Sequence, residues 1–266
     1  MNTALDWRAA TLKNGFRDAT AYRVEFFSDI VGSAIVPAAI QLVFWHALFT
    51  LGGATEVAGM TFTDMIHYTI VSVLFSQVRG GDQDFELGEM IRTGTLSNYL
   101  LRPVSVVEFI YLRGAAPRFL IAGLSLILGL ILSLWLGGAS PVRVCGAMVM
   151  AVMGNVIHYQ IGAVLSTMGF YWEDAYSMLM VKNLVVSILS GELLPLNLFP
   201  ASMRWIWEST PFYLYVFGPT QYALGRWTHL EFLHHLGIAL IWMLGLWFLI
   251  RMTWKIGIRR YLSLGG

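Results

Sequence analysis

The feature that most constrains the fold is a series of apolar segments, several of them long enough to cross a lipid bilayer. The clearest, residues 30–55, carries no formal charge and exceeds the roughly 20 apolar residues that a membrane-spanning helix needs. Hydrophobic residues make up 57% of the chain and charged residues only 12%, whereas a soluble domain has about 25% charged residues. The mean hydropathy of +0.64 agrees with this. We therefore expect an all-α integral membrane protein with one transmembrane domain over residues 1–266.

The apolar segments predict six membrane spans. Their expected bounds are residues 30–55, 61–78, 119–138, 144–172, 175–194 and 232–250. Pro37 predicts a kink in the first span. Before that span, residues 3–27 mix aromatic with basic side chains, which is typical of a helix lying in the headgroup region of a membrane. An ordinary soluble amphipathic helix is the alternative for these residues.

Residues 195–228 form a different kind of segment. Four prolines interrupt it, it is rich in aromatic residues, and only Arg204, Glu208 and Arg226 carry charge. It is too broken for one straight span and too apolar for a loop in water. Because non-helical backbone at membrane depth is tolerated only inside protein or along a cavity, we expect a pair of short, partly re-entrant helices.

The distribution of lysine and arginine predicts which ends of the spans face the cytoplasm. Thirteen of these residues lie in the N-terminal segment, the connection after the second span and the C-terminal tail, and three lie in the opposite connections. Cytoplasmic connections of membrane proteins carry the excess of basic residues. Six spans with both termini in the cytoplasm satisfy this bias, and they place the connection after the second span in the cytoplasm too.

That connection contains a polar, charged stretch, Asp82–Pro103, in which a short helix is expected over 84–101. Asp82 or Asp84 can cap the start of the helix, and Gly94 interrupts it or ends its first half. An apolar set and a charged set follow helical spacing in the first half: Leu87, Met90 and Ile91, with Glu86, Glu89 and Arg92. Leu96, Tyr99 and Leu100 continue the apolar pattern up to Arg102. Such an amphipathic helix needs a surface to lie against, either the lipid interface or a soluble partner.

Polar residues inside the expected spans are candidate pathway residues. Asn155 and His158 lie one turn apart on the fourth span, where hydrogen bonding between helices is the plainer interpretation. Lys182, near the cytoplasmic end of the fifth span, is expected to reach the interface by snorkelling. Glu192, at the outer end of that span, is expected to pair with Arg204 or Arg226, and a role in a transport pathway is the second interpretation.

Several function classes are excluded by what the sequence lacks. The net charge is only +1, and the sequence has no basic patch that would indicate a nucleic-acid partner. The single cysteine excludes an internal disulfide and a multi-cysteine metal site. No serine-nucleophile elbow and no His-Glu-x-x-His motif is present, so we assign no catalytic, metal or cofactor residues. The chain also lacks the Gly-x-x-x-x-Gly-Lys-Ser/Thr loop that holds nucleotide phosphates, so it is not itself an ATPase.

Two local patterns, together with the predicted topology, carry a resemblance that covers nearly the whole chain. The first runs from Ile91 to Pro103 and reads IRTGTLSNYLLRP. The second runs from Ser190 to Pro200 and reads SGELLPLNLFP, with Pro-Phe and a further proline downstream. In this combination the chain resembles the permease subunits of type-2 ATP-binding-cassette (ABC-2) exporters, which include drug-resistance and polysaccharide-export permeases.

The resemblance implies partners and roles. The helix after the second span would be the coupling helix, docked in a groove of a separate ATPase subunit through Glu86, Leu87, Glu89, Met90, Ile91, Arg92, Tyr99 and Arg102. Two ATPase subunits would bind ATP and Mg²⁺, and a second permease chain, identical or related, would complete the pathway in a bacterial plasma (inner) membrane. The residues assigned to the pathway or its outer gate are Asn155, His158, Glu192, Phe199 and Phe212. Rigid packing of an outer dimer face is the alternative for the last two.

Two other functions stay open as alternatives. An ion-coupled secondary transporter would have charged residues near mid-membrane and broken helices in both halves of the chain, but only the second half has a broken segment. A membrane-embedded lipid-modifying enzyme would need acid, base or nucleophile residues clustered at one interface, and the sequence shows none.

Overall fold

The computed structural model describes residues 3–21, 28, 31–80, 83–134, 140–172 and 175–263. All regular secondary structure in this part of the chain is helical, apart from one isolated β-bridge between Val57 and Met60. Some predicted features lie outside the described residues: the end of the N-terminal helix at 22–27, Asp82 and the end of the third span at 135–139. Within the described ranges, the all-helical fold is confirmed.

Among the described residues, four helical segments are long and apolar enough to cross a membrane: Val31–Leu51, Val106–Ser133, Pro141–Phe170 and His229–Tyr261. They correspond to the first, third, fourth and sixth predicted spans. The second and fifth predicted spans form α4 (Phe62–Arg79) and the shorter apolar helix α9 (Ala175–Leu189). Six spans with both ends in the cytoplasm therefore remains a prediction, while a multi-pass membrane protein is what these helices indicate.

The first span is a helix of mixed winding. It begins as the π-helix η1 (Val31–Ile35), continues as α3 (Val36–His46) and ends as the π-helix η2 (Ala47–Leu51). Pro37 stands in the first turn of α3, directly after the change from π-helical to α-helical winding, and the expected kink there stays a prediction.

Two helices extend beyond their predicted bounds through charged sequence. α7 (Val106–Ser133) begins 13 residues before the expected start at residue 119, with Ser105 capping it through the backbone N–H of Glu108. α12 (His229–Ser263) continues through the basic tail after residue 250. In α7 the early start is possible because charged side chains pair with neighbouring helices, among them Glu108 with Arg8 of α1 (Thr3–Ala21) at 2.6 Å.

Helix α8 (Pro141–Ser166), followed by the 3₁₀ turn η3 (Thr167–Phe170), lies at the centre of the bundle and contacts α4, α7, α9 and α12. The main apolar core joins α4, α8, α12 and α11 (Phe217–Ala223), which is buried over its whole length. The broken segment at 195–228 was predicted as a pair of short, partly re-entrant helices. The structure has five short helices there instead: η4 (Leu196–Leu198), η5 (Ala201–Met203), α10 (Arg204–Glu208), η6 (Phe212–Leu214) and α11.

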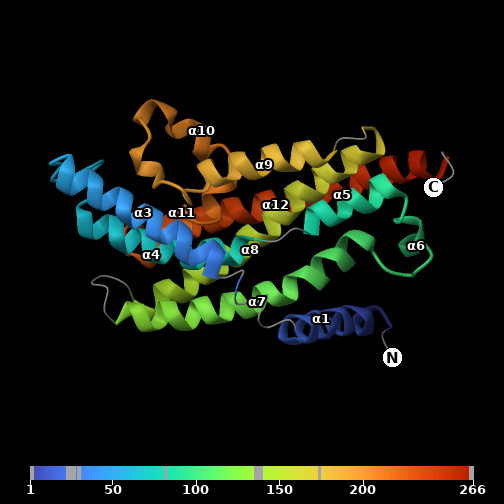
Figure 1. Cartoon of the computed structure of the whole chain (residues 1–266). Coiled ribbons are helices and arrows are strands. Elements are labelled where there is room, and N and C mark those ends of the chain that lie inside the picture. The colour runs from blue at the N-terminus through green and yellow to red at the C-terminus, as the bar shows by residue number, and fades with distance from the viewer. Residues whose placement is uncertain are drawn as a thin grey trace.

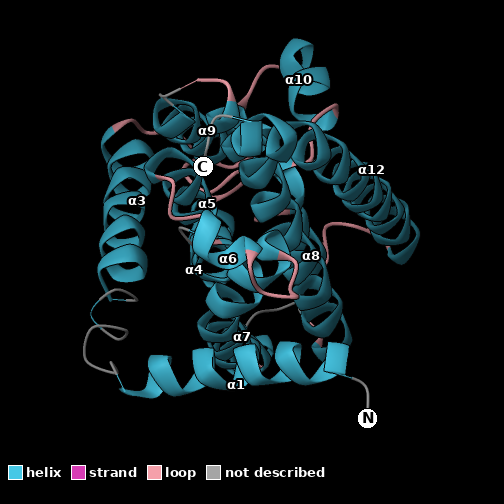
Figure 2. Ribbon diagram, turned by 90° about the vertical axis from the view of Figure 1, so that its right-hand side faces the viewer, coloured by secondary structure: helices cyan, strands magenta, loops and turns pink. Residues whose placement is uncertain are grey.

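The long helices run lengthwise and separate two ends of the molecule (Figure 1). Helices α5 (Gln83–Thr93) and α6 (Ser97–Leu100) lie toward the same end as the C-terminal part of α12 and the start of α1, while α10 lies away from that end. Viewed from the α6 end, α1 stretches across the side of the bundle beside α7 (Figure 2). The end that carries α5 and α6 is the one predicted to face the cytoplasm.

Candidate functional site

The expected coupling helix is two short helices joined at Gly94. The backbone of Gly94 has φ = +78°, a left-handed conformation that favours glycine, and α5 ends just before it. The Gly94 carbonyl accepts a hydrogen bond of 2.6 Å from the hydroxyl of Tyr261, near the end of α12. The turn between α5 and α6 is therefore fixed to the far end of the chain.

The apolar face of α5 points into the protein. Leu87, Met90 and Ile91 are buried, as is Leu96 in the turn before α6, and they form a second apolar core with α7, α8 and α12. Tyr99 packs at the edge of this core against Phe109, with ring centroids 5.8 Å apart. The resemblance implied that Leu87, Met90 and Ile91 fill a groove of the ATPase, but the structure packs them against the chain's own spans.

The opposite face of α5 and α6 is polar and exposed. Glu89 and Arg92 are each 54% exposed and form a side-chain pair of 2.7 Å within the helix, and this hydrogen bond and the positive charge hold the pKa of the Glu89 carboxyl below its usual value. Arg102 lies over the Tyr99 ring at 5.2 Å. Beside it Leu101 is 89% exposed. We call the exposed residues Glu89 and Arg92 of α5, with Leu101 and Arg102 directly after α6, the outward face.

The remaining acidic residues of α5 bind the protein's own cations. Glu86 forms an ion pair with Arg113 of α7. Asp84 is 1% exposed, and its carboxylate pairs with the Lys182 ammonium of α9. The expected snorkelling of Lys182 is therefore wrong: its side chain is only 3% exposed, because α5 folds into the bundle and brings a carboxylate to it. Asp84 does not precede α5 as a capping residue. It lies in the first turn of the helix, and its side chain forms this ion pair.

Helix α8 is shaped to admit this pair. A Cβ atom at Gly162 would overlap the Asp84 carboxylate, so α5 can approach α8 this closely only at a glycine. One turn further on, the Ser166 hydroxyl donates a hydrogen bond of 2.7 Å to the Asp84 backbone carbonyl. His158 lies one turn before Gly162, and its Nε2 is 3.4 Å from the Lys182 ammonium nitrogen. The buried pair thus joins α5, α8 and α9.

The C-terminal end of α9 is a second junction, which we call the α9 corner, residues 190–192. The Tyr68 hydroxyl of α4 donates to the Gly191 carbonyl at 2.6 Å, and the Phe217 N–H of α11 donates to the Ser190 carbonyl at 2.9 Å. Glu192 pairs with Arg79, at the end of α4, at 2.6 Å. The α9 corner therefore holds helices that are far apart in the sequence.

The Glu192 pairing corrects the sequence prediction. Arg204 pairs instead with Glu208 one turn away at 2.6 Å, and Arg226 pairs with Asp64 at 2.9 Å. Arg79 is one of the thirteen basic residues counted above toward the cytoplasmic side, in the connection after the second span. The structure places it inside the bundle, where its side chain is 14% exposed.

Asn155 secures the end of α4. Its amide nitrogen donates to the carbonyls of Val78 and Arg79 at 3.1 and 3.2 Å, and its amide oxygen accepts from the Tyr111 hydroxyl at 3.1 Å. Those carbonyls belong to the last turn of α4, which has no partners further along the helix. The plainer interpretation, hydrogen bonding between helices, is confirmed for Asn155.

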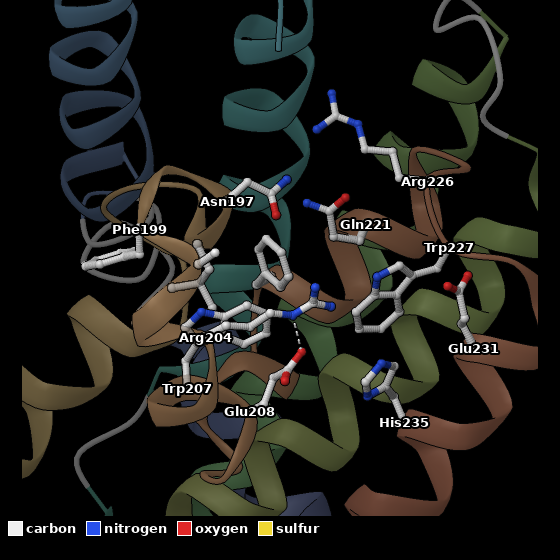
Figure 3. Close-up of a pocket in the computed structure, with 13 residues that line it drawn as sticks. Asn197, Phe199, Arg204, Trp207, Glu208, Gln221, Arg226, Trp227, Glu231 and His235 are labelled. Carbon is white, nitrogen blue, oxygen red and sulfur yellow. Dashed lines mark hydrogen bonds and ion pairs between the residues drawn. The ribbon is translucent and has the colours of Figure 1, made fainter. Parts of the chain in front are cut away.

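A cavity of about 520 Å³ lies between the broken segment and the start of α12. Phe199, one of the predicted gate residues, lines it together with Trp207, Trp227 and His235 (Figure 3). Phe212, the other, does not line the cavity and contacts the Tyr215 ring at 5.9 Å. The structure therefore separates the two aromatic residues that were assigned together.

Residues 35–265 match the protein family described as ABC-2 family transporter protein. This range covers most of the chain. The chain belongs to the ABC-2 transporter family. No significant match was found among curated proteins or among solved structures. Membership makes this ABC-2 protein a membrane component of a transporter and agrees with the resemblance carried by its two sequence patterns.

Both junctions lie within the ABC-2 family match. The structure adds Asp84, Lys182 and Arg79 to the predicted site, which already included Glu192. The sequence contains a signal for each junction: a single lysine in an apolar span, and an acidic residue directly after Ser-Gly at the end of that span. Neither signal indicates which residue is the partner, because Lys182 is 98 positions from Asp84 and Glu192 is 113 positions from Arg79 in the sequence.

Proposed function

We propose that this chain is the permease subunit of an ATP-driven exporter, powered by separate ATPase subunits that dock on the outward face. Two permease chains, identical or related, form the pathway between them, and two ATPase subunits bind ATP and Mg²⁺ beneath. The proposal includes six spans with both termini in a bacterial cytoplasm. Family membership makes the chain a transporter component, and the alternatives of a secondary transporter or a lipid enzyme have no specific observation in their favour.

The observation that carries the proposal is the division of α5 and α6 into two faces. The inward face holds the apolar residues and is already packed, so it has no free groove-filling surface. The outward face holds an exposed ion pair, an arginine and one almost fully exposed leucine. An exposed leucine next to an arginine, on the same pair of helices as an exposed ion pair, suits a soluble protein partner, because protein interfaces combine apolar contacts with polar contacts at the rim.

The buried side of α5 supports a route by which a movement of the ATPase reaches the membrane spans. A push on the outward face moves α5, and the Asp84–Lys182 pair transfers that displacement to α9. Helix α9 is one rigid element between this pair and the α9 corner, where Tyr68, Arg79 and Phe217 are bound. In this proposal α9 is the lever through which ATPase closure reaches the broken segment.

Exchanging the two charges of the exposed pair, as Glu89→Arg with Arg92→Glu, tests docking without removing the pair from the helix. We expect capture of the cognate ATPase subunit by the purified permease to fall about tenfold or more, because like charges facing each other across an interface cost several kcal/mol. Co-purification and ATPase activity of the complex measure this.

The matched control is the same exchange in α10, Arg204→Glu with Glu208→Arg, at a pair that is also exposed and intrahelical. It should leave ATPase capture unchanged. Equal loss in both variants, or no loss in the first, would contradict docking on the outward face.

A further inference from the structure

The cavity beside α10 and α12 is not used by the coupling route and has the size of a ligand site. Its volume of about 520 Å³ lies within the roughly 300–1,000 Å³ of small-molecule pockets. Its walls come from η4, η5, α10, α11 and the first turns of α12, so the broken segment folds around it and the start of α12 closes it (Figure 3). It is away from α5 and α6, on the half of the molecule predicted to lie outside the cytoplasm.

The charged groups of the wall balance one another. Arg204 and Arg226 supply two positive charges, and Glu208 and Glu231 supply two negative charges. Each has a partner: Arg204 pairs with Glu208, Arg226 pairs with Asp64 outside the cavity, and Glu231 accepts from the N–H of Thr228 at 2.7 Å. A wall of this kind has no net charge to attract a simple anion or cation, but it offers both signs to a ligand that carries both.

One buried polar group of the wall is unsatisfied. Gln221 is 3% exposed, and its side-chain nitrogen Nε2 has no hydrogen-bond partner. A buried donor without an acceptor is costly, so the site is improved by a ligand oxygen that accepts from it. Gln221 lies near the Arg226 backbone, whose N–H donates to the Gln221 carbonyl at 2.9 Å, and Figure 3 shows the two side chains together on the side of the cavity away from Glu208.

Three large apolar residues that neighbour wall residues in the sequence are exposed. Met203 and Trp205 flank Arg204 in the sequence, and Leu230 precedes Glu231, and all three large side chains face outward. A polar cavity in a membrane protein, with exposed apolar side chains adjacent in the sequence to its wall residues, fits an amphiphile whose polar head enters the cavity and whose chains stay outside it.

We propose that this cavity binds the headgroup of a zwitterionic phospholipid. The phosphate oxygens accept from Gln221 Nε2 on the side of Arg226, and the amine lies toward Glu208 and Glu231. The exposed Arg204–Glu208 pair is weak enough to open for the ligand, since such i,i+4 pairs contribute only about 0.3–0.5 kcal/mol. The proposal stands independently of ATPase docking, because no residue of the outward face takes part.

The test replaces Gln221 by leucine in the full-length protein purified in a neutral detergent. Leucine has a similar size and removes the unsatisfied donor, so the variant should fold at least as stably as the parent. Phosphatidylethanolamine should raise the melting temperature of the parent more than phosphatidylglycerol does. In the Gln221→Leu variant this difference should vanish, with affinity for phosphatidylethanolamine lower by about tenfold or more.

The matched control is Gln160→Leu in α8, which removes a buried glutamine outside the cavity. It loses a hydrogen bond of 3.2 Å to the Met243 carbonyl and also removes a buried amide oxygen that has no partner, and it should keep the preference for phosphatidylethanolamine. Soluble glycerophosphoethanolamine at equal concentration should have little effect. An equal effect of the soluble headgroup would overturn the lipid assignment, and an unchanged preference in Gln221→Leu would overturn the site.

Discussion

Lys182→Met will lower the free energy of unfolding by about 3–5 kcal/mol, because it leaves the Asp84 carboxylate buried without its partner. Both side chains of the pair are almost fully buried, so water cannot replace the lost ammonium group. Asp84→Leu should have a comparable cost, since it strands the lysine instead. Equilibrium unfolding in mixed micelles, followed by circular dichroism, measures the difference.

The double variant Asp84→Leu with Lys182→Met separates stability from transmission. Replacing both charges of a buried pair by apolar groups is often neutral or stabilising, so the double variant should regain most of the lost stability. It should still bind the ATPase, because the outward face is intact, but the coupled ATPase activity should stay low. Restored activity would show that the pair only stabilises the fold, and an unchanged stability of Lys182→Met would contradict the burial of the pair.

Gly162→Ala will have an effect of similar size from a single methyl group. The new Cβ would overlap the Asp84 carboxylate, so α5 must move away from α8. Overpacking alone costs about 1–3 kcal/mol. Displacing the carboxylate from Lys182 adds to this, and we expect about 3 kcal/mol or more in total. Unfolding in mixed micelles and ATPase activity of the complex should both report the loss.

Gly237→Ala in α12 is the matched control, because a Cβ at that position meets no atom within 4 Å. It should be neutral or stabilise the helix by up to about 1 kcal/mol through its higher helix propensity. If Gly162→Ala behaves like Gly237→Ala, the close approach of α5 to α8 is wrong.

The elements that depend on local sequence could be predicted. An uncharged apolar run has few ways to satisfy its backbone in a membrane other than as a helix, and four such runs became the long helices. Gly94 was expected to interrupt the polar helix, and it does so with a positive φ. The prolines of residues 195–228 likewise predicted short helices.

The predictions that failed concern charges whose partners come from elsewhere in the chain. The prediction that Lys182 snorkels assumed that no carboxylate lies near it inside the membrane. The structure folds α5 inward, and Asp84 pairs with Lys182 there. The third span was expected to begin after the charged residues Glu108 and Arg113. These residues stand on α7 and are neutralised by Arg8 of α1 and Glu86 of α5. Local hydropathy counts each such charged residue as unfavourable in a membrane helix. Ion pairs with neighbouring helices remove that penalty, and they depend on tertiary packing that local sequence does not show.

The central claim, that an ATPase docks on the outward face, is tested most directly by photo-crosslinking in native membranes. A photoreactive amino acid placed at Leu101, which is 89% exposed, should crosslink to a protein that carries a nucleotide-binding phosphate loop. The same amino acid at Leu128, an exposed apolar position in α7, is the control and should yield no ATPase adduct. An ATPase adduct from position 101 alone is the predicted result. Adducts with lipid only at both positions would contradict docking and leave α5 and α6 as an interfacial connector.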